Sequence, residues 1–197
     1  MGNPILLKNR TASGAIAAHR IVARSGTEGV RAQAASVTDK LSGICAEVGP
    51  ANGERFDEIV AGLADVQYGG VVTEGDELTS DADGKAVAVT APRIHQSGIA
   101  GGVAGAHAVA AVLATDVLVS VLAIDATDAT ESIADLTAEF AVTGAGAIGN
   151  VGGTDTTGKL LVVTWRNPDV HIIGSAEVSG TADEIGLCRV EPRILRA

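Results

Sequence analysis

Aromatic residues are scarce in this sequence, which has one Trp, one Tyr and two Phe among its 197 residues. Hydrophobic residues still make up 46% of the chain, so a core must consist of Val, Ile, Leu and Ala side chains. A core of this kind favours layers of β-strand over a few large aromatic anchors. The rings are also too few to form a surface on which bases stack, so we expect no binding to single-stranded nucleic acid.

Cysteine is nearly absent as well. Cys45 and Cys188 lie far apart in the sequence and in no Cys-x-x-Cys pair. Their number and spacing exclude a disulfide framework and do not match a zinc site. We therefore expect both to be small buried residues.

Basic residues do not balance the acidic ones: 14 Lys and Arg against 24 Asp and Glu give a formal net charge of −10. A surface of this sign repels phosphate backbones and anionic lipids, so neither nucleic acid nor a membrane is an expected partner. The first residues lack the long apolar run of a secretory signal, which predicts synthesis in the cytoplasm. Residues 99–124 are strongly apolar, but they include glycines, His107 and Asp116. Two strands joined at residues 114–116 explain them better than a membrane span.

Two segments of the chain resemble each other. Residues 14–32 can be aligned with residues 70–88, and each reads as a short strand, a polar corner, a second strand, a glycine turn and a third strand. Asp83-Gly84 in the second copy suits a tight hairpin, because glycine accepts a positive φ. The first copy continues through residues 41–63, but its counterpart appears only at residues 172–187. The second copy is therefore interrupted.

The interruption predicts two domains. Residues 1–92 and 167–197 form one β domain built from the duplicated unit, and residues 93–166 form an inserted domain. Pro92 and Pro168 stand at the borders, where proline suits the entry and exit of a domain.

The inserted domain has a β pattern of its own. Residues 117–124 and 160–165 are nearly continuous apolar runs, and Phe140 begins another apolar segment. Gly, Thr and Asp fill the intervals, so turns recur as in a small β-sandwich. The expected fold class of the whole chain is mainly β.

Two glycine-rich segments resemble nucleotide-binding sequence motifs. Residues 144–149 match Gly-x-Gly-x-x-Gly, but residues 150–158 are too rich in Gly and Thr to form the helix that this motif requires. Residues 153–160 miss the P-loop pattern, because Leu160 replaces the hydroxyl residue that binds magnesium. We interpret both segments as turns between strands and predict no cofactor.

Catalytic and metal-binding patterns are not found in the sequence. The four histidines follow no metal-ligand spacing, and no serine lies in Gly-x-Ser-x-Gly. The pairs Asp57-Glu58 and Asp183-Glu184 occur at matching places of the repeat, but neighbours in a strand point to opposite faces. We expect them to solubilise strand edges. The prediction is a protein that is not an enzyme, with no catalytic and no metal-binding residues.

Residues 70–87 and 173–180 carry a resemblance to the small β-barrel capsid decoration proteins of tailed bacteriophages. Residues 115–165, especially 133–140 and 152–165, are similar to a β module that is common in phage virion proteins. The resemblance implies a homotrimer on the outer capsid surface of the virion, made in the host cytoplasm. There it would bind the major capsid protein and stabilise the shell against DNA pressure. A structural component of the tail or of a head fibre is the alternative.

The N-terminal segment is the predicted contact with the capsid or with a neighbouring subunit. It combines an apolar run with two basic residues; the candidates are Pro4, Ile5, Leu6, Leu7, Lys8 and Arg10. Terminal segments without internal partners are often disordered until they dock. Ile5 to Leu7 also fit the first strand of the β domain, and the sequence leaves both interpretations open.

Overall fold

The structure is a computed structural model that describes residues 3–90, 94–100, 106–108, 116–125, 134–145, 147–150, 152, 156, 159–166 and 168–195. Within these residues strands dominate and no α-helix occurs, so the mainly β class is confirmed. None of the described segments is a helix long and apolar enough to cross a membrane. The chain divides into two compact units, which we call unit 1 (Met1–Ala91 with Asp169–Arg196) and unit 2 (Pro92–Pro168 with Ala197).

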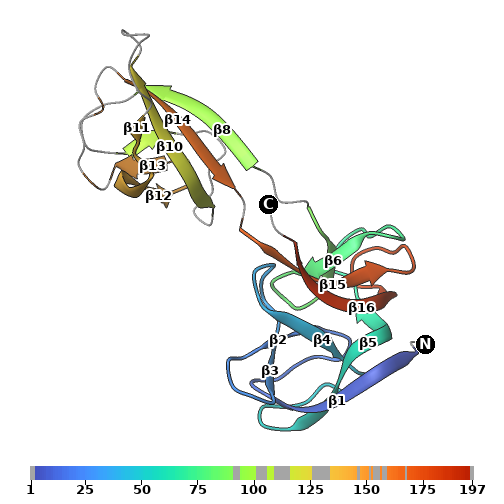
Figure 1. Cartoon of the computed structure of the whole chain (residues 1–197). Coiled ribbons are helices and arrows are strands. Elements are labelled where there is room, and N and C mark those ends of the chain that lie inside the picture. Colours follow the sequence, from blue (N-terminus) through green and yellow to red (C-terminus); the bar gives the residue numbers. More distant parts are fainter. Residues whose placement is uncertain are drawn as a thin grey trace. The chain divides into compact units, whose positions relative to one another are not determined.

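Unit 1 contains one nine-stranded sheet with the order β1-β3-β2-β4-β5-β16-β15-β6-β7 (Figure 1). Its strands are β1 (Pro4–Ala12), β2 (Ile21–Arg24), β3 (Val30–Gln33), β4 (Leu41–Cys45), β5 (Arg55–Gln67), β6 (Glu77–Ser80), β7 (Ala86–Ala88), β15 (Val170–Ala176) and β16 (Ile185–Leu195). Because β1 pairs with both β3 and β5, the order β1-β3-β2-β4-β5 closes on itself.

The strand pairing of unit 1 repeats in the order seen in the sequence, but the predicted match of Asp57-Glu58 with Asp183-Glu184 is wrong, because Asp183-Glu184 corresponds to Gly53-Glu54. β2 and β3 form an antiparallel hairpin, β4 pairs with β2, and β5 pairs with β4. β6, β7, β15 and β16 pair in the same way. The first part of β5 pairs with β1 and its last part pairs with β16, so β5 belongs to both groups of strands. We call β1 to β4 with the first part of β5 the first half, and the remaining strands with the last part of β5 the second half.

Backbone hydrogen bonds outside the strands also match between the halves. The amide of Ala12 donates to the carbonyl of Glu54 at 2.8 Å, and the amide of Tyr68 donates to the carbonyl of Glu184 at 2.9 Å. The other matching donors and acceptors are Gly53 to Ala12 and Asp183 to Tyr68, Ile16 to Pro50 and Val72 to Gly180, and Cys45 to Arg20 and Ala176 to Asp76. These bonds define which residues of the two halves are equivalent.

The sequence has the string Ala-Glu-Val at residues 46–48 and at residues 176–178, but the equivalence of β4 and β15 differs by one residue from a match of these strings. Cys45 lies opposite Glu58 and Ala176 lies opposite Cys188. Glu58 and Cys188 follow the matched residues Glu54 and Glu184 at the same interval. Cys45 is therefore the counterpart of Ala176, and the residues after them, Ala46 and Glu177, are equivalent too. The second half has one residue fewer than the first half in the turn that follows.

The core of unit 1 is largely aliphatic, as the shortage of rings requires. One cluster of buried side chains draws on both halves, and a smaller one in the first half contains Phe56. Cys45 and Cys188 are both buried and free, so the prediction for them is confirmed. Gly84 ends the turn between β6 and β7 with φ of +73°, as expected for this hairpin.

Unit 2 contains a four-stranded sheet, β11-β10-β14-β8, and a three-stranded sheet, β12-β13-β9. The strands are β8 (Ile94–Ala100), β9 (Ala106–Ala108), β10 (Val117–Asp125), β11 (Ala134–Asp135), β12 (Phe140–Gly144), β13 (Ala147–Asn150) and β14 (Lys159–Arg166). Side chains of both sheets, among them Val121, Leu161, Phe140 and Ile148, form one buried cluster. The strands predicted at residues 117–124, at 160–165 and from Phe140 are confirmed, whereas most of the predicted connection at 114–116 lies outside the described residues.

Candidate interaction surface

The first glycine-rich motif forms a hairpin. Gly144 is the last residue of β12 and residues 147–149 lie in β13, which pairs antiparallel with β12 and continues to Asn150. A strand thus occupies the place where a dinucleotide site needs a helix N-terminus, and most of the segment predicted as a turn belongs to the two strands of the hairpin. Most of the second motif lies outside the described residues, and its last two residues begin β14.

The histidines, cysteines and carboxylates of the described residues form no group of three or more that could hold a metal ion. Burial raises the pKa of the Cys45 thiol to about 11 and that of the Cys188 thiol to about 12. The thiolate is the nucleophilic form of cysteine, so neither side chain is activated at neutral pH.

The predicted contact residues all lie in β1, and β1 is a paired strand. Leu7 lies opposite Ile59 of β5, and Pro4 lies opposite Gly62. Of the two open interpretations, the first strand of the β domain is therefore the one that the structure shows, and this segment is not a free arm. Pairing does not bury its side chains: Ile5 is 82% exposed, Leu6 44% and Leu7 46%.

Arg10 differs from the other predicted contact residues, because its guanidinium has an internal partner. Its Nε donates to Glu58 Oε2 at 2.8 Å. The other carboxylate oxygen of Glu58 accepts from Arg31 Nε at 3.0 Å and from Ser42 Oγ at 2.6 Å. Glu58 is completely buried. The prediction that Glu58 solubilises a strand edge is therefore wrong: alternation turns Asp57 outward and Glu58 into the unit.

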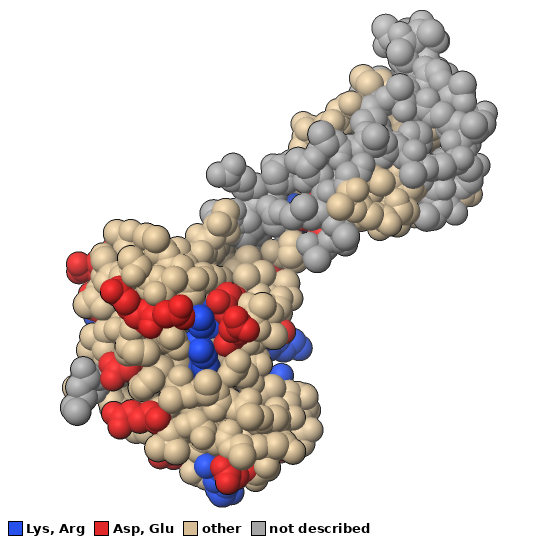
Figure 2. All heavy atoms as spheres, turned by 180° about the vertical axis from the view of Figure 1, so that it is seen from behind, with Lys and Arg blue, Asp and Glu red and all other residues tan. Residues whose placement is uncertain are grey.

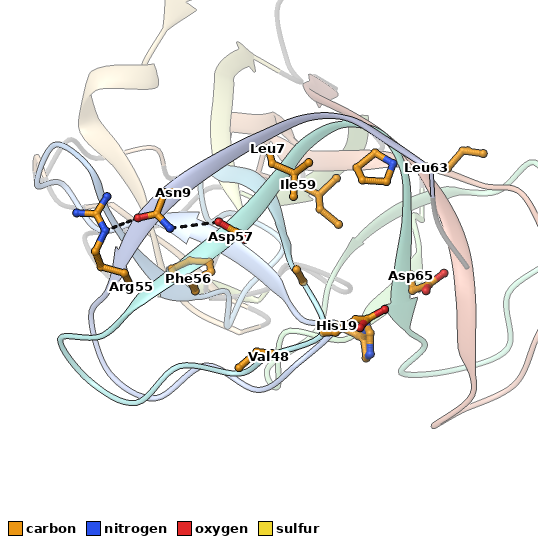
Figure 3. A pocket seen from close by; sticks show the side chains of 13 residues that line it. Leu7, Asn9, His19, Val48, Arg55, Phe56, Asp57, Ile59, Leu63 and Asp65 are labelled. Atoms are coloured by element: carbon orange, nitrogen blue, oxygen red, sulfur yellow. Dashed lines mark hydrogen bonds between the residues drawn. The ribbon is translucent and has the colours of Figure 1, made fainter.

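A hollow of about 420 Å³ opens beside β1, and we call it the β1–β5 groove. Figure 3 shows its side chains, which come from β1, from β5, from His19 and from the turn after β4. The residues that line it are Pro4, Leu7, Asn9, His19, Ala46, Glu47, Val48, Arg55, Phe56, Asp57, Ile59, Leu63 and Asp65. Of the predicted contact residues, Pro4 and Leu7 are part of it, and Val48 adds a side chain that is 79% exposed.

The polar side chains of the groove are partly tied to one another. Asn9 donates from Nδ2 to Asp57 Oδ1 at 3.2 Å, and its Oδ1 accepts a hydrogen bond from Arg55 Nε. Glu47 and Asp65 contribute two further carboxylates. With three carboxylates and one guanidinium among its lining residues, the groove carries a net negative charge and favours cationic groups.

His19 has an uncommon backbone conformation, with φ of 60°. A residue with a side chain costs about 1–2 kcal/mol in this left-handed region, so such residues are found where the surrounding structure enforces them. The His19 amide donates to the Cys45 carbonyl at 3.1 Å. Its Nδ1 is buried and has no hydrogen-bond partner among the described residues. Nothing in the sequence indicated a special role for His19.

A second hollow of about 300 Å³ has the opposite charge. It is lined by Arg24, Lys40, Leu41, His171, Pro192, Arg193 and Ile194. Burial, followed by the charge of Lys40, lowers the pKa of His171, whereas Asp169 and Asp39 act in the other direction. Arg193 forms an ion pair with Glu77, with Nη2 and Oε1 2.5 Å apart.

Elsewhere on unit 1, opposite charges lie close together, and Figure 2 shows basic and acidic side chains side by side on one face. Lys85 Nζ lies 2.5 Å from Asp183 Oδ1, and this hydrogen bond lowers the pKa of Asp183. The groove differs from this mixture because it combines an excess of carboxylates with exposed apolar side chains.

These observations define a mainly β protein of two units whose candidate functional site is an interaction surface. Comparison with known proteins adds no relative: no family model, no curated protein and no solved structure matches the chain.

Proposed function

We propose that the chain is a structural protein of a tailed-phage virion that binds the outer surface of the capsid and stabilises the lattice of the major capsid protein. The observation that carries the proposal is the exposure of Ile5, Leu6 and Leu7 on a strand that is already paired. Exposed apolar side chains grouped on a surface are typical of sites that bind other proteins. A partner that covers them would gain hydrophobic contact without having to order the strand first.

The proposed mechanism needs no turnover. A protein that binds the assembled lattice but not the separate capsid subunits stabilises the assembly by mass action. The capsid then requires a higher temperature or pressure to open.

The finer details of the fold belong to the same proposal. We take each closed set of strands in unit 1 as a small β-barrel of the decoration type. Closure of β1 onto β5 supports this in the first half, and the parallel bridge between Tyr68 and Ala86 supports it in the second. For unit 2 we propose a β-sandwich, because its two sheets share one buried cluster.

The proposed partners are the major capsid protein and further copies of the chain, arranged as a homotrimer on the capsid of the virion. They follow from the resemblance of residues 70–87 and 173–180 to decoration proteins. A tail or head-fibre component is the alternative.

The test is to add the purified chain to expanded empty capsids of its own phage that lack the protein. The proposal predicts that the chain sediments with the capsids, saturates at a fixed stoichiometry and raises their melting temperature. Tails isolated from the same phage are the control surface. Absence of sedimentation with capsids would contradict the proposal, and co-purification with tails would favour the alternative.

A further inference from the structure

The two halves of unit 1 allow the groove to be compared with an equivalent surface on the same backbone. Arg20 and Asp76 are equivalent, because their carbonyls accept matching hydrogen bonds from β4 and β15. The residues before them are His19 and Gly75. Both have a positive φ, 60° for His19 and 90° for Gly75. The fold therefore requires the left-handed conformation here, and the second half meets it with glycine, which adopts it without strain.

The first half has a histidine at this position despite the cost, and that histidine lines the groove. A strained residue at the wall of a cavity points to a function of its side chain, because glycine would suffice for the fold. The buried Nδ1 of His19, which lacks a hydrogen-bond partner in the described part of the chain, agrees with this.

A second difference lies on the floor of the groove. Ala46 and Ile59 line it in the first half. Their counterparts in the second half are Glu177 and Arg189, whose side chains form an ion pair with Nε and Oε1 2.7 Å apart. The second half thus has an ion pair where the first half has two apolar side chains, of which Ile59 is buried.

Charge and exposure indicate what the groove would bind. Leu7 and Val48 offer exposed apolar surface, and the carboxylates of Glu47 and Asp57 line the groove with them. A single guanidinium, that of Arg55, opposes these carboxylates, and Asn9 accepts its hydrogen bond. An occupant must therefore supply an apolar side chain and a positive charge close to it.

We propose that the β1–β5 groove is the docking site for an extended segment of the partner protein in which an apolar side chain stands next to a lysine or arginine. The identification of that partner as the coat protein rests on the function proposed above. The kind of side chains that the groove binds does not depend on that proposed function.

The probe is an acetylated hexapeptide with a central leucine between two lysines and glycines at its ends. Glutamates replace the lysines in one control peptide, and serine replaces the leucine in another. Binding is followed by amide chemical shifts of the full chain. We expect the lysine peptide to shift the amides of His19, Glu47 and Val48, and added salt to weaken its binding because the groove contacts are charged. Both control peptides should bind about tenfold more weakly or not at all.

Two variants test the groove itself. His19→Gly restores the residue type of the second half, so the melting temperature should stay the same or rise while peptide affinity falls about tenfold. Glu47→Lys should weaken binding by a similar factor, whereas Glu74→Lys, an exposed glutamate outside the lining, should leave it unchanged. Equal binding of all three peptides, or unchanged affinity of both groove variants, would overturn the proposal. Shifts caused by raising the concentration of the chain alone would overturn it in favour of a second copy as the occupant.

The same variants separate this inference from the proposed function. If the wild-type chain binds the peptide but no capsid, the groove chemistry stands and the proposed function fails. If the wild-type chain and the His19→Gly variant bind capsids equally well, the groove is not the docking site although the proposed function stands.

Discussion

Glu58 and Cys188 occupy the same position in the two halves of unit 1, and both are completely buried. Glu58 is surrounded by the hydrogen-bond donors of Arg10, Arg31 and Ser42. The counterparts of Arg31 and Ser42 in the second half are Ala86 and Ile173, which are buried together with Cys188 in the main hydrophobic cluster. One backbone thus accommodates a charged interior in the first half and an apolar one in the second.

Replacing only one member of the charged cluster should be strongly destabilising. Glu58→Cys leaves the guanidinium of Arg31 buried without its counter-charge, which costs about 3–5 kcal/mol of unfolding free energy. Adding Arg31→Ala and Ser42→Ile copies these three positions of the second half and should recover much of the loss, because only the partly exposed Arg10 then lacks its partner. Urea unfolding of the single and triple variants measures both effects. A triple variant no more stable than Glu58→Cys would show that the halves are not interchangeable at this position.

Two equivalent glycines should be intolerant of any side chain. A Cβ at Gly174 would lie 1.8 Å from the carbonyl oxygen of Arg189, and one at Gly43 would lie 2.6 Å from that of Ile59. Since both obstacles are backbone atoms, each change to alanine should destabilise unit 1 by about 3 kcal/mol or more. Gly70→Ala is the control, since nothing lies within 4 Å of its Cβ position; it should stay within about 0.5 kcal/mol in thermal unfolding. A mild effect at Gly174 would refute the close approach of β15 to β16.

Local signals in the sequence were sufficient for several strands and for the hairpin of β6 and β7. The apolar runs predicted β10 and β14, and the pair Asp83-Gly84 predicted the turn before β7, because these features depend on neighbouring residues only. Packing between the halves could not be predicted in this way. Ala12 and Phe56 in the first half correspond to Tyr68 and Gly186 in the second, where a Cβ at Gly186 would lie 2.1 Å from the Tyr68 ring. The large side chain thus occupies one of the two positions in the first half and the other position in the second half. Neither position therefore looks repeated in the sequence.

The candidate site was predicted only at its N-terminal edge. Pro4 and Leu7 stood out as part of an apolar run, whereas His19 and Val48 join the groove only through the pairing of distant strands. The inward orientation of Glu58 also depends on the register of β5 against β1. A shift by one residue would have turned Asp57 inward, and the sequence does not specify that register.

His171 should make stability depend on pH. Its pKa in the folded protein lies below the ordinary value of 6.5, mainly because of burial. The unfolded chain then binds a proton more readily than the folded one, so the free energy of unfolding should fall as pH falls below 6.5. His171→Gln should reduce this dependence between about pH 7.5 and about pH 5.5 in urea titrations. An NMR titration that places the pKa of His171 at or above 6.5 would contradict the buried environment.

Unit 1 should fold without unit 2. β3 and β4 are joined by residues 34–40, whereas their counterparts β7 and β15 are separated by unit 2. A chain in which a copy of residues 34–40 replaces residues 92–168 of unit 2 should unfold cooperatively, with a stability change of about 1 kcal/mol from the altered loop length. Circular dichroism and an amide NMR spectrum would check this. A collapsed, poorly dispersed spectrum would show that unit 1 depends on the insertion.

The central claim is that the groove side of unit 1 faces the capsid, and hydroxyl-radical footprinting tests it most directly. Leu7 is 46% exposed and Val48 is 79% exposed, while Val71, which is not among the lining residues of the groove, is 77% exposed. All three side chains should be oxidised in the free chain. On capsids, oxidation of Leu7 and Val48 should fall severalfold while that of Val71 stays constant. Unchanged oxidation of Leu7 and Val48 in the bound chain would contradict the claim.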